Sequence, residues 1–286
     1  MTPNRPIMAS SLKYDTAVVG ANGYLGKALV EKLLELDNKV LAVYNSDKNN
    51  IPSRATTISI QDFQSQTFEI ETIFFLAGSY RSTRLELISL HCDILKYIVI
   101  RYKYSKHIFI SSTNVYGTSN LSVSLDSPYI NPSSYGMAKL VGEYIVSAAK
   151  KYSILRLTYL YGPHLKNNSF LPNLINQALI QKEIILFGDG KRAQDYLHIN
   201  DAVNLCLLAS KKCTNEVYLG ATGLSYTNNY IANFVASKIY NCKVVYREGD
   251  EGVTYNYDPS DTFQKLNWKP DFPFDLGLMQ MIECAI

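Results

Sequence analysis

Short runs of β-branched and aromatic residues alternate with longer amphipathic segments through the first half of the chain. The short runs predict strands at Thr16–Val19, Val40–Tyr44, Thr57–Ile60, Thr72–Leu76, His107–Ser111 and Ser153–Leu157. Apolar residues at helical spacing predict helices at Tyr24–Leu36, Leu85–Tyr102 and Tyr135–Lys150. Strands that alternate with helices form a parallel sheet covered on both faces, so the predicted fold is α/β and doubly wound.

The second half of the chain has a different pattern. It predicts a loop at Tyr161–Asn168, a helix at Leu171–Ile180, a turn at Gly188–Gly190, a helix after Asn200–Asp201, a helix at Pro259–Leu266 and a turn at Trp268–Pro270. We therefore expect a flexible polar tail at 1–13, a sheet domain at 14–160, and a smaller substrate-binding lobe in 161–286. A strand near 217–219 is expected to return to the sheet. Ligands of open α/β sheets bind at the carboxyl ends of the strands, where such a lobe can close over them.

Three glycines follow the first predicted strand and precede the first predicted helix, at Gly20, Gly23 and Gly26. A tight strand-to-helix turn without side chains lets backbone amides approach a pyrophosphate, which the helix N-terminus favours electrostatically. The spacing in this context predicts a dinucleotide-binding unit of the Rossmann type.

Composition excludes several classes of protein. The chain has 286 residues, 47% of them hydrophobic, and a net charge of +3, which is too small to predict a nucleic-acid or membrane partner. No apolar run approaches the roughly 20 residues of a membrane helix, and no signal segment is visible. Five scattered cysteines without a CxxC pair predict neither a disulfide framework nor a metal site. We expect a cytoplasmic protein without a bound metal.

Tyr135 and Lys139 form a YxxxK pair, which projects from one face of a helix. A tyrosine with its ordinary pKa of about 10 is a poor base at neutral pH, and a nearby ammonium lowers that pKa. The spacing also occurs at Tyr44–Lys48 and Tyr102–Lys106 in this chain of 22 tyrosines, but only Tyr135 opens an amphipathic helix. Ser112 ends the fifth predicted strand, where its hydroxyl can hold a carbonyl or alcohol oxygen beside the phenol.

The chain resembles the extended short-chain dehydrogenases that act on nucleotide-activated sugars, such as UDP-galactose 4-epimerase and its relatives. The resemblance covers nearly all of the chain after the tail, in the family's order. Its motifs are Gly-Ala-Asn-Gly-Tyr-Leu-Gly (20–26), Phe-Phe-Leu-Ala-Gly (74–78), Phe-Ile-Ser-Ser-Thr-Asn-Val-Tyr-Gly (109–117), Ser-Tyr-Gly-Met-Ala-Lys (134–139), Tyr-Gly-Pro (161–163), Gly-Asp-Gly (188–190), Asp-Tyr-Leu-His-Ile-Asn-Asp (195–201), Arg-Glu-Gly-Asp (247–250) and Leu-Asn-Trp-Lys-Pro (266–270).

The resemblance implies a role for individual residues. Ser112, Tyr135 and Lys139 fall on the family's catalytic hydroxyl, acid/base and nicotinamide-ribose lysine. Cofactor contacts are implied for Gly20, Asn22, Gly23, Tyr24, Leu25, Gly26, Asp62, Leu76, Ala77 and Gly78, with Asp62 at the adenine, and also for Tyr135 and Lys139. Arg247 matches an arginine that contacts nucleotide phosphates, and His198 is expected to be a packed structural histidine. The family also dimerises through a four-helix bundle, which Leu85–Tyr102 and Tyr135–Lys150 would supply.

Departures from the family pattern narrow the expected chemistry. Thr113 and Asn114 replace the Asp-Glu pair of the sugar 4,6-dehydratases, and removing water needs such an acid/base pair. Tyr159 stands where 4-epimerases often have a sugar-binding asparagine. Gln194 stands where many relatives have a phosphate-binding arginine; Arg192, two residues away, is a candidate substitute. We expect Thr113, Asn114, Tyr159, Gln194 and Arg247 at the substrate.

The residues after the second strand bear on the cofactor. A carboxylate there would bind the ribose hydroxyls of NAD and repel a 2′-phosphate. Tyr44 holds that place, followed by Asn45, Ser46 and Lys48, which can accept a phosphate, while Asp47 opposes it. The expected cofactor is NADP, with a slight preference over NAD.

Two reactions fit the predicted Ser112–Tyr135–Lys139 triad. A reductase delivers hydride once to C4 of a 4-keto sugar, whereas a 4-epimerase holds NAD tightly and returns hydride to the opposite face. Tyr44, Tyr159 and the Thr113–Asn114 pair favour the reductase. A dinucleotide-binding protein without turnover is the third alternative, although such relatives typically lose the tyrosine or the lysine.

Overall fold

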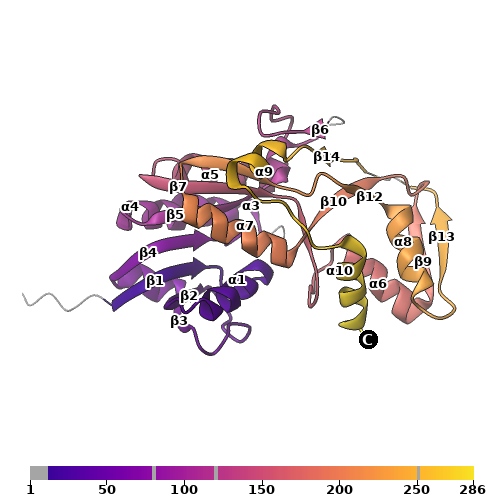
Figure 1. Cartoon of the computed structure of the whole chain (residues 1–286), viewed down its shortest axis with the longest axis horizontal. Coiled ribbons are helices and arrows are strands. Elements are labelled where there is room, and N and C mark those ends of the chain that lie inside the picture. The colour runs from indigo at the N-terminus through magenta and orange to yellow at the C-terminus, as the bar shows by residue number, and fades with distance from the viewer. Residues whose placement is uncertain (1–11, 79–81, 119–121, 250–251) are drawn as a thin grey trace, which may run out of the picture.

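The parallel sheet that the sequence predicts is present in a computed structural model of the chain, which describes residues 12–78, 82–118, 122–249 and 252–286. Seven strands lie in the order β11-β7-β5-β4-β1-β2-β3, and every neighbouring pair is parallel. They are β1 (Leu12–Val19), β2 (Val40–Tyr44), β3 (Thr56–Ser59), β4 (Phe68–Phe75), β5 (Lys106–Ser112), β7 (Lys151–Leu157) and β11 (Glu216–Gly220). The doubly wound α/β fold class is confirmed (Figure 1).

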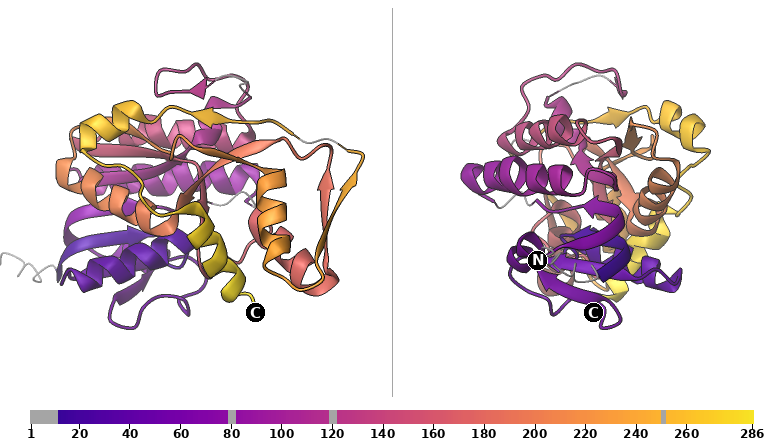
Figure 2. Two further views of the ribbon diagram at one scale, coloured as in Figure 1. Left: turned by 45° about the vertical axis from the view of Figure 1, so that its right-hand side comes forward. Right: turned by 90° about the vertical axis from the view of Figure 1, so that its left-hand side faces the viewer.

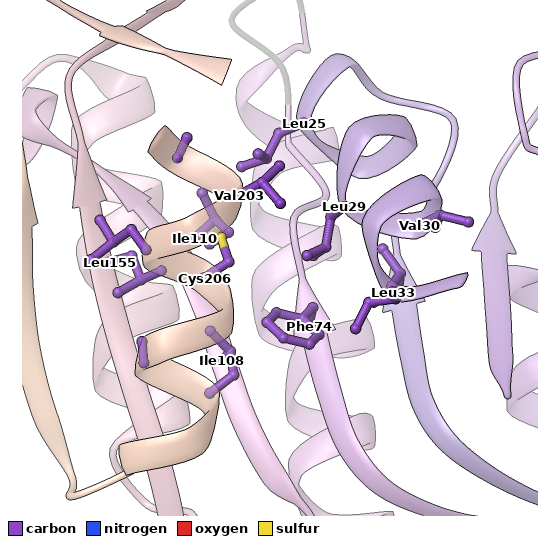
Figure 3. Packing of buried hydrophobic residues seen from close by; sticks show 14 of the residues in the cluster. Leu25, Leu29, Val30, Leu33, Phe74, Ile108, Ile110, Leu155, Val203 and Cys206 are labelled. Atoms are coloured by element: carbon purple, nitrogen blue, oxygen red, sulfur yellow. The ribbon is translucent and has the colours of Figure 1, made fainter. Parts of the chain in front are cut away.

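One face of the sheet is covered by α1 (Tyr24–Glu35) and α7 (Ile199–Lys212). Leu25, Leu29 and Leu33 recur along α1 at helical spacing and are buried. Figure 3 shows Leu29 and Leu33 beside Phe74 of β4, while Leu25 lies next to Val203 of α7 and Cys206 of α7 lies next to Ile110 of β5. This apolar layer holds the glycine-rich turn between β1 and α1 against the sheet.

The other face is covered by α2 (Ile60–Ser65), by a long helical stretch before β5, and by α5 (Ser134–Val146). The sequence predicted one helix at Leu85–Tyr102. The stretch comprises α3 (Arg84–Ile88), the π-helix η1 (Ser89–Leu95) and α4 (Lys96–Arg101). Hydrophobic spacing does not report such a change of winding, because a π turn adds only about one residue to the helical period.

The second lobe lies beyond the carboxyl ends of the strands (Figures 1 and 2). It contains α6 (Phe170–Gln181), β9 (Glu183–Phe187), α8 (Asn228–Ser237), β13 (Lys243–Arg247) and α10 (Phe274–Glu283) around an apolar cluster. A three-stranded sheet of β8 (Tyr159–Tyr161), β10 (Ala193–His198) and β12 (Ser225–Thr227) connects it to the central sheet. The remaining elements are η2 (Thr113–Tyr116), β6 (Ser122–Val123), β14 (Asn256–Tyr257) and α9 (Ser260–Leu266).

The boundary between the tail and the first strand differs from the sequence prediction. Leu12 and Lys13 were assigned to the tail, but they pair with Phe68 and Glu69 as the start of β1. Residues 1–11 of the predicted tail lie outside the described residues. The strand begins earlier than predicted because only Tyr14 is buried among Leu12–Asp15. A segment with one exposed face contains polar residues, so it lacks the continuous apolar run by which the strand was recognised. Across the described residues, no helix combines the length and the apolar character that spanning a membrane needs.

We expect substitution of Gly26 by alanine to destabilise the fold more than substitution of Gly23. A Cβ on Gly26 would lie 2.1 Å from the carbonyl oxygen of Gly20, whereas a Cβ on Gly23 would lie 3.3 Å from it. Forcing α1 away from the turn costs about 1–3 kcal/mol. Thermal unfolding of the cofactor-free proteins should show a Tm loss of roughly 5 °C for Gly26→Ala and no more than about 2 °C for Gly23→Ala. Equal losses would contradict this account of the turn.

Candidate active site

The turn between β1 and α1 leaves backbone amides free at the start of a helix. Gly20 has φ +90°, a conformation that side chains rarely adopt, and its N–H donates to the Val43 carbonyl at 3.0 Å. Gly23 is the N-cap of α1 and supplies no capping side chain. The first amides of a twelve-residue helix therefore point at the carboxyl edge of the sheet, as a pyrophosphate site requires.

A cleft of about 450 Å³ opens beside this turn. Seven of the residues predicted to bind the cofactor line it: Gly20, Asn22, Gly23, Asn45, Leu76, Ala77 and Gly78. Its size, its elongated lining from β2 to Gly78, and the side-chain-free turn fit a dinucleotide. The cleft is therefore the candidate NAD(P) site.

The other predicted cofactor residues do not line the cleft. Gly26 and Leu25 are buried beneath the turn, and Tyr24 donates from its hydroxyl to the Pro163 carbonyl at 3.1 Å. Ser46 and Lys48 lie on the exposed loop after β2. Asp62 is exposed and accepts a hydrogen bond from the Ser59 hydroxyl at 2.7 Å. Ile60 lines the cleft in its place.

Sequence reasoning missed the cleft wall formed by α3 and the π-helix, which contributes Ser82, Glu86, Ser89, Leu90 and Ile94. Glu86 is held there by a capping box, in which Thr83 and Glu86 each bond the other's backbone N–H. The Thr83-x-x-Glu86 spacing was the available signal. The backbone N–H and hydroxyl of Thr83 lower the pKa of the Glu86 carboxyl. Glu86 is the only charged side chain among the described residues that line the cleft.

Lys139 lies behind the far wall of the cleft and is buried on all sides, with 1% of its surface exposed. Its Nζ donates to the Ile110 carbonyl at 2.8 Å and lies 3.4 Å from the Ala77 carbonyl. A Cβ on Gly78 would lie 3.1 Å from the same Nζ, so glycine at this cleft-lining position lets the lysine pack closely behind the wall. Burial lowers the pKa of Lys139 to about 7, and the charge of Glu143 opposes that shift.

Ser112 ends β5, two residues beyond the carbonyl that holds Lys139. Its Oγ accepts from the backbone N–H of Asn114 at 3.2 Å and from the Asn114 side-chain amide at 3.0 Å. With both donors in place, the hydroxyl hydrogen of Ser112 is left to donate to another oxygen. Asn114 therefore orients the predicted catalytic hydroxyl.

Tyr135 lies half-buried in the first turn of α5, and its ring centroid is 5.6 Å from Nζ of Lys139. The turn packs tightly on η2, because a Cβ on Gly136 would lie 2.2 Å from the Asn114 carbonyl oxygen. Ser133 caps the helix by accepting from the Gly136 N–H at 3.2 Å. Shared contacts with Asn114 and β5 thus gather Ser112, Tyr135 and Lys139 at one edge of the sheet.

His91 of the π-helix is a fully buried histidine that sequence reasoning did not single out. Its Nδ1 lies 2.8 Å from the Leu87 carbonyl, and its ring packs on Phe75 and Phe109. Burial lowers its pKa to about 4, and the nearby Lys139 charge adds to the shift. His91 is therefore a neutral ring beneath the lysine at physiological pH.

A second cavity of about 220 Å³ holds two of the predicted substrate residues, Tyr159 and Gln194, together with Arg192. Arg192 donates from Nε to the Val253 carbonyl at 3.1 Å, and its side chain lines the cavity. Phe170 and Tyr196 add aromatic walls. The cavity combines a guanidinium, an amide and aromatic surfaces, which suits a phosphorylated sugar.

Thr113 and Arg247 lie apart from this cavity. Thr113 is buried and shares a hydrogen bond with the hydroxyl of Tyr257. Arg247 ends the outer strand β13, where its guanidinium lies 3.9 Å from Glu183. Asp250 of the same motif falls outside the described residues. His198 stacks on Phe272 with ring centroids 3.6 Å apart, and its Nδ1 accepts from the Asn200 N–H, so it packs as a structural side chain.

The described part of the chain contains no group of three or more His, Cys, Asp or Glu side chains placed to hold a metal ion. The polar groups gathered at the carboxyl edge are instead a hydroxyl, a phenol and an ammonium. They can orient an oxygen and exchange a proton with it.

Comparison with protein families gives one match, to the NAD dependent epimerase/dehydratase family over residues 16–219. The match includes the glycine-rich turn, the cleft, and the Ser112, Tyr135 and Lys139 positions.

Individual relatives extend over nearly the whole chain. A putative UDP-glucose 4-epimerase of Methanocaldococcus jannaschii is 26% identical over 93% of this chain and 96% of its own length. The CDP-abequose synthase of Salmonella typhimurium is 23% identical over 95% and 98%. The crystal structure of a UDP-glucose 4-epimerase from Thermotoga maritima, with UDP-glucose, superimposes with a TM-score of 0.80 at 25% identity, covering 95% of this chain and 98% of that one.

We expect the stability of the cofactor-free protein to rise between pH 7 and 9 because of Lys139. Its folded pKa of about 7 lies below its ordinary value of 10.5, so in this window the unfolded chain binds the proton and the folded protein loses it. The free energy of unfolding should therefore rise by roughly 1–2 kcal/mol. Urea unfolding at pH 7, 8 and 9 should show this rise in the wild type and not in Lys139→Met. Equal slopes in both proteins would refute the assignment.

Proposed function

The chain belongs to the NAD dependent epimerase/dehydratase family, and from this premise we propose that it reduces a nucleotide-linked 4-keto sugar at C4. The observation that carries the proposal is the pairing of Ser112 with the amide of Asn114 beside the buried Lys139. This set can protonate and orient one oxygen. It holds no carboxylate at positions 113 and 114 to remove water from the sugar, so we do not propose dehydration.

Each residue of the site has a distinct role in this reaction. Ser112 donates its hydroxyl hydrogen to the C4 oxygen and fixes the carbonyl in place. Tyr135 donates a proton to that oxygen as the alcohol forms. Lys139 holds its positive charge 5.6 Å from the tyrosine ring, which favours the phenolate that remains. NAD in the cleft supplies the hydride when it is bound in the reduced form.

Charge in the cleft bears on the choice of cofactor. The expectation of NADP rested on the lack of a carboxylate at the end of the second strand and on Asn45, Ser46 and Lys48. Of these three residues, only Asn45 lines the cleft, and Ser46 and Lys48 are exposed. Glu86 does line it, and a carboxylate disfavours an added phosphate. Tyr44 and Asn45 provide neutral groups at the end of β2. We therefore propose that NAD binds more tightly than NADP.

Arg192 is proposed as the phosphate-binding cation of the substrate cavity. It is the only charged side chain among the described residues lining that cavity, where Gln194 contributes an amide. Tyr159, with its hydroxyl kept neutral because burial raises its pKa, is proposed to pack against the sugar.

A 4-epimerase is the second candidate, and it is supported by the likeness to the putative UDP-glucose 4-epimerase of Methanocaldococcus jannaschii and to the Thermotoga maritima UDP-glucose 4-epimerase. The same residues would act, with Tyr135 first accepting the proton from the C4 hydroxyl and later returning it. In the reductase, the oxidised cofactor leaves the enzyme after each turnover. In the epimerase, NAD is regenerated and stays bound.

The proposal predicts that purified protein oxidises NADH when given a nucleotide-linked 4-keto-6-deoxysugar. Tyr135→Phe should lower kcat by a factor of about 10² or more, because the proton donor is lost. Its Kd for NAD should stay within about twofold of wild type, since the phenol does not line the cleft. Interconversion of UDP-hexoses without net reduction would identify an epimerase. NAD binding without either reaction would identify a non-catalytic dinucleotide-binding protein.

We also propose that the chain forms a homodimer through α3, α4 and α5. Large apolar side chains are exposed along these helices: Leu85, Ile88, Ile100, Met137 and Val141, with Tyr144 82% exposed. Helices that expose such a surface gain by packing on a second copy. Sedimentation should find a dimer for the wild type and a monomer for Tyr144→Glu, because the new carboxylate would be buried unpaired. A wild-type monomer would contradict this proposal.

A further inference from the structure

The most buried ion pair of the described residues lies one helical turn beyond Lys139. Glu143 of α5 accepts from Arg156 of β7 through two parallel bonds, Nη2 to Oε2 at 2.7 Å and Nε to Oε1 at 3.0 Å. The two side chains are 8% and 5% exposed. Burial alone would lower the pKa of Arg156, but the bonds and charge of Glu143 raise it above its ordinary value. The pair therefore remains ionised inside the protein.

The guanidinium also binds two tyrosines. Nη1 donates to the Tyr116 hydroxyl at 2.9 Å, and Nη2 donates to the Tyr129 hydroxyl at 2.6 Å. The guanidinium carbon lies 5.0 Å and 5.2 Å from the two ring centroids. On the other side, the Ser111 hydroxyl donates to Glu143. The network thus joins β5, β7, α5 and η2 around one cation.

Tyr129 differs from the other members because it belongs to the irregular segment that leads into the catalytic helix. The next residue, Ile130, pairs with η2 through its N–H to the Tyr116 carbonyl and through its carbonyl to the Thr118 N–H, both at 2.9 Å. Asn131 then takes a left-handed conformation with φ +50°, and Ser133 caps α5. Tyr135 therefore lies six positions after Tyr129.

We infer that Tyr129 is a positioning residue for Tyr135, because its bond to Arg156 fixes the segment Ser127–Ser133 from which the first turn of α5 begins. The inference rests on the proposed function in that it takes Tyr135 as the acid/base. No residue of the segment 127–133 is buried, so apolar packing does not fix it. The turn packs on η2 through Gly136, and the phenol–guanidinium contact and the pairing of Ile130 hold the chain that enters this turn.

Loss of the Tyr129 hydroxyl leaves the buried ion pair complete. Glu143 keeps both bonds from Arg156, so Tyr129→Phe creates no unpaired buried charge. Tyr129 is 50% exposed, and its ring can stay in place over the guanidinium. The substitution therefore separates positioning from folding.

The test compares Tyr129→Phe with Tyr240→Phe, which removes a hydroxyl from a tyrosine 85% exposed on the second lobe. Hydrogen exchange of the NAD-bound proteins should rise about tenfold at the amides of residues 130–137 in Tyr129→Phe and be unchanged in Tyr240→Phe. With the 4-keto sugar, kcat should fall about tenfold while the KM for the sugar and the Kd for NAD stay within about twofold, since only Tyr135 has moved.

Unchanged exchange at residues 130–137 would overturn the inference, whether or not the enzyme turns over the 4-keto sugar. Faster exchange with an unchanged kcat would also overturn it, because the segment would then be ordered without positioning Tyr135. Failure of the proposed function has a different signature, in which wild type and variant both leave the sugar unreacted. In that case a rise in exchange confined to Tyr129→Phe still supports the positioning of α5.

Arg156→Lys provides a second variant. It keeps a positive charge for Glu143 but loses the fork that reaches both tyrosines. It should raise exchange over the same residues and lower kcat at least as much as Tyr129→Phe does. If hydrogen exchange at residues 130–137 is the same in Arg156→Lys as in the wild type, the inference that this network orders the segment is overturned.

Discussion

The buried ammonium of Lys139 is the constraint on which the arrangement of this site depends. An unpaired charge in a protein interior is costly. Lys139 is stabilised by the Ile110 carbonyl of β5, by the Ala77 carbonyl just beyond β4, and by the charge of Glu143. These partners fix the distance between α5 and the carboxyl ends of β4 and β5. The same contacts that neutralise the lysine therefore bring a phenol, a hydroxyl and the dinucleotide cleft to one edge of the sheet.

The sequence predicted those parts of the molecule whose signal lies within a short stretch of chain. The strand–glycine–helix order at Gly20–Gly26 and the YxxxK pair opening α5 each carry a short-range signal, and both lie at the carboxyl edge of the parallel sheet. The predicted helix at Leu85–Tyr102 is helical to Arg101, but it contains a π-helix whose His91 packs against Phe75 and Phe109. Spacing along the chain does not contain that information.

The parts that sequence could not predict depend on contacts between distant residues. Glu86 lines the cleft because α3 lies along it. Asp62 does not line the cleft, and its carboxylate accepts a hydrogen bond from the Ser59 hydroxyl. Arg156 has no local motif, yet it binds Glu143 thirteen positions earlier and Tyr116 forty positions earlier. The predicted substrate residues lie in two separate places. Tyr159 and Gln194 share a cavity because β8 pairs with β10, whereas Arg247 lies on the separate pair of strands β13 and β9.

The path of the chain between its two lobes limits how such a protein can be divided. After β8 and β10, whose residues line the candidate substrate cavity, the chain returns through α7 to β11, whose Leu219 N–H donates to Thr262 of α9. After α9 the chain passes from the central sheet back to the second lobe, where α10 packs. No single cut separates a cofactor half from a substrate half. Recombination that exchanges sugar specificity among relatives must therefore join several noncontiguous segments at once, and gradual change of cavity side chains is the more accessible evolutionary route.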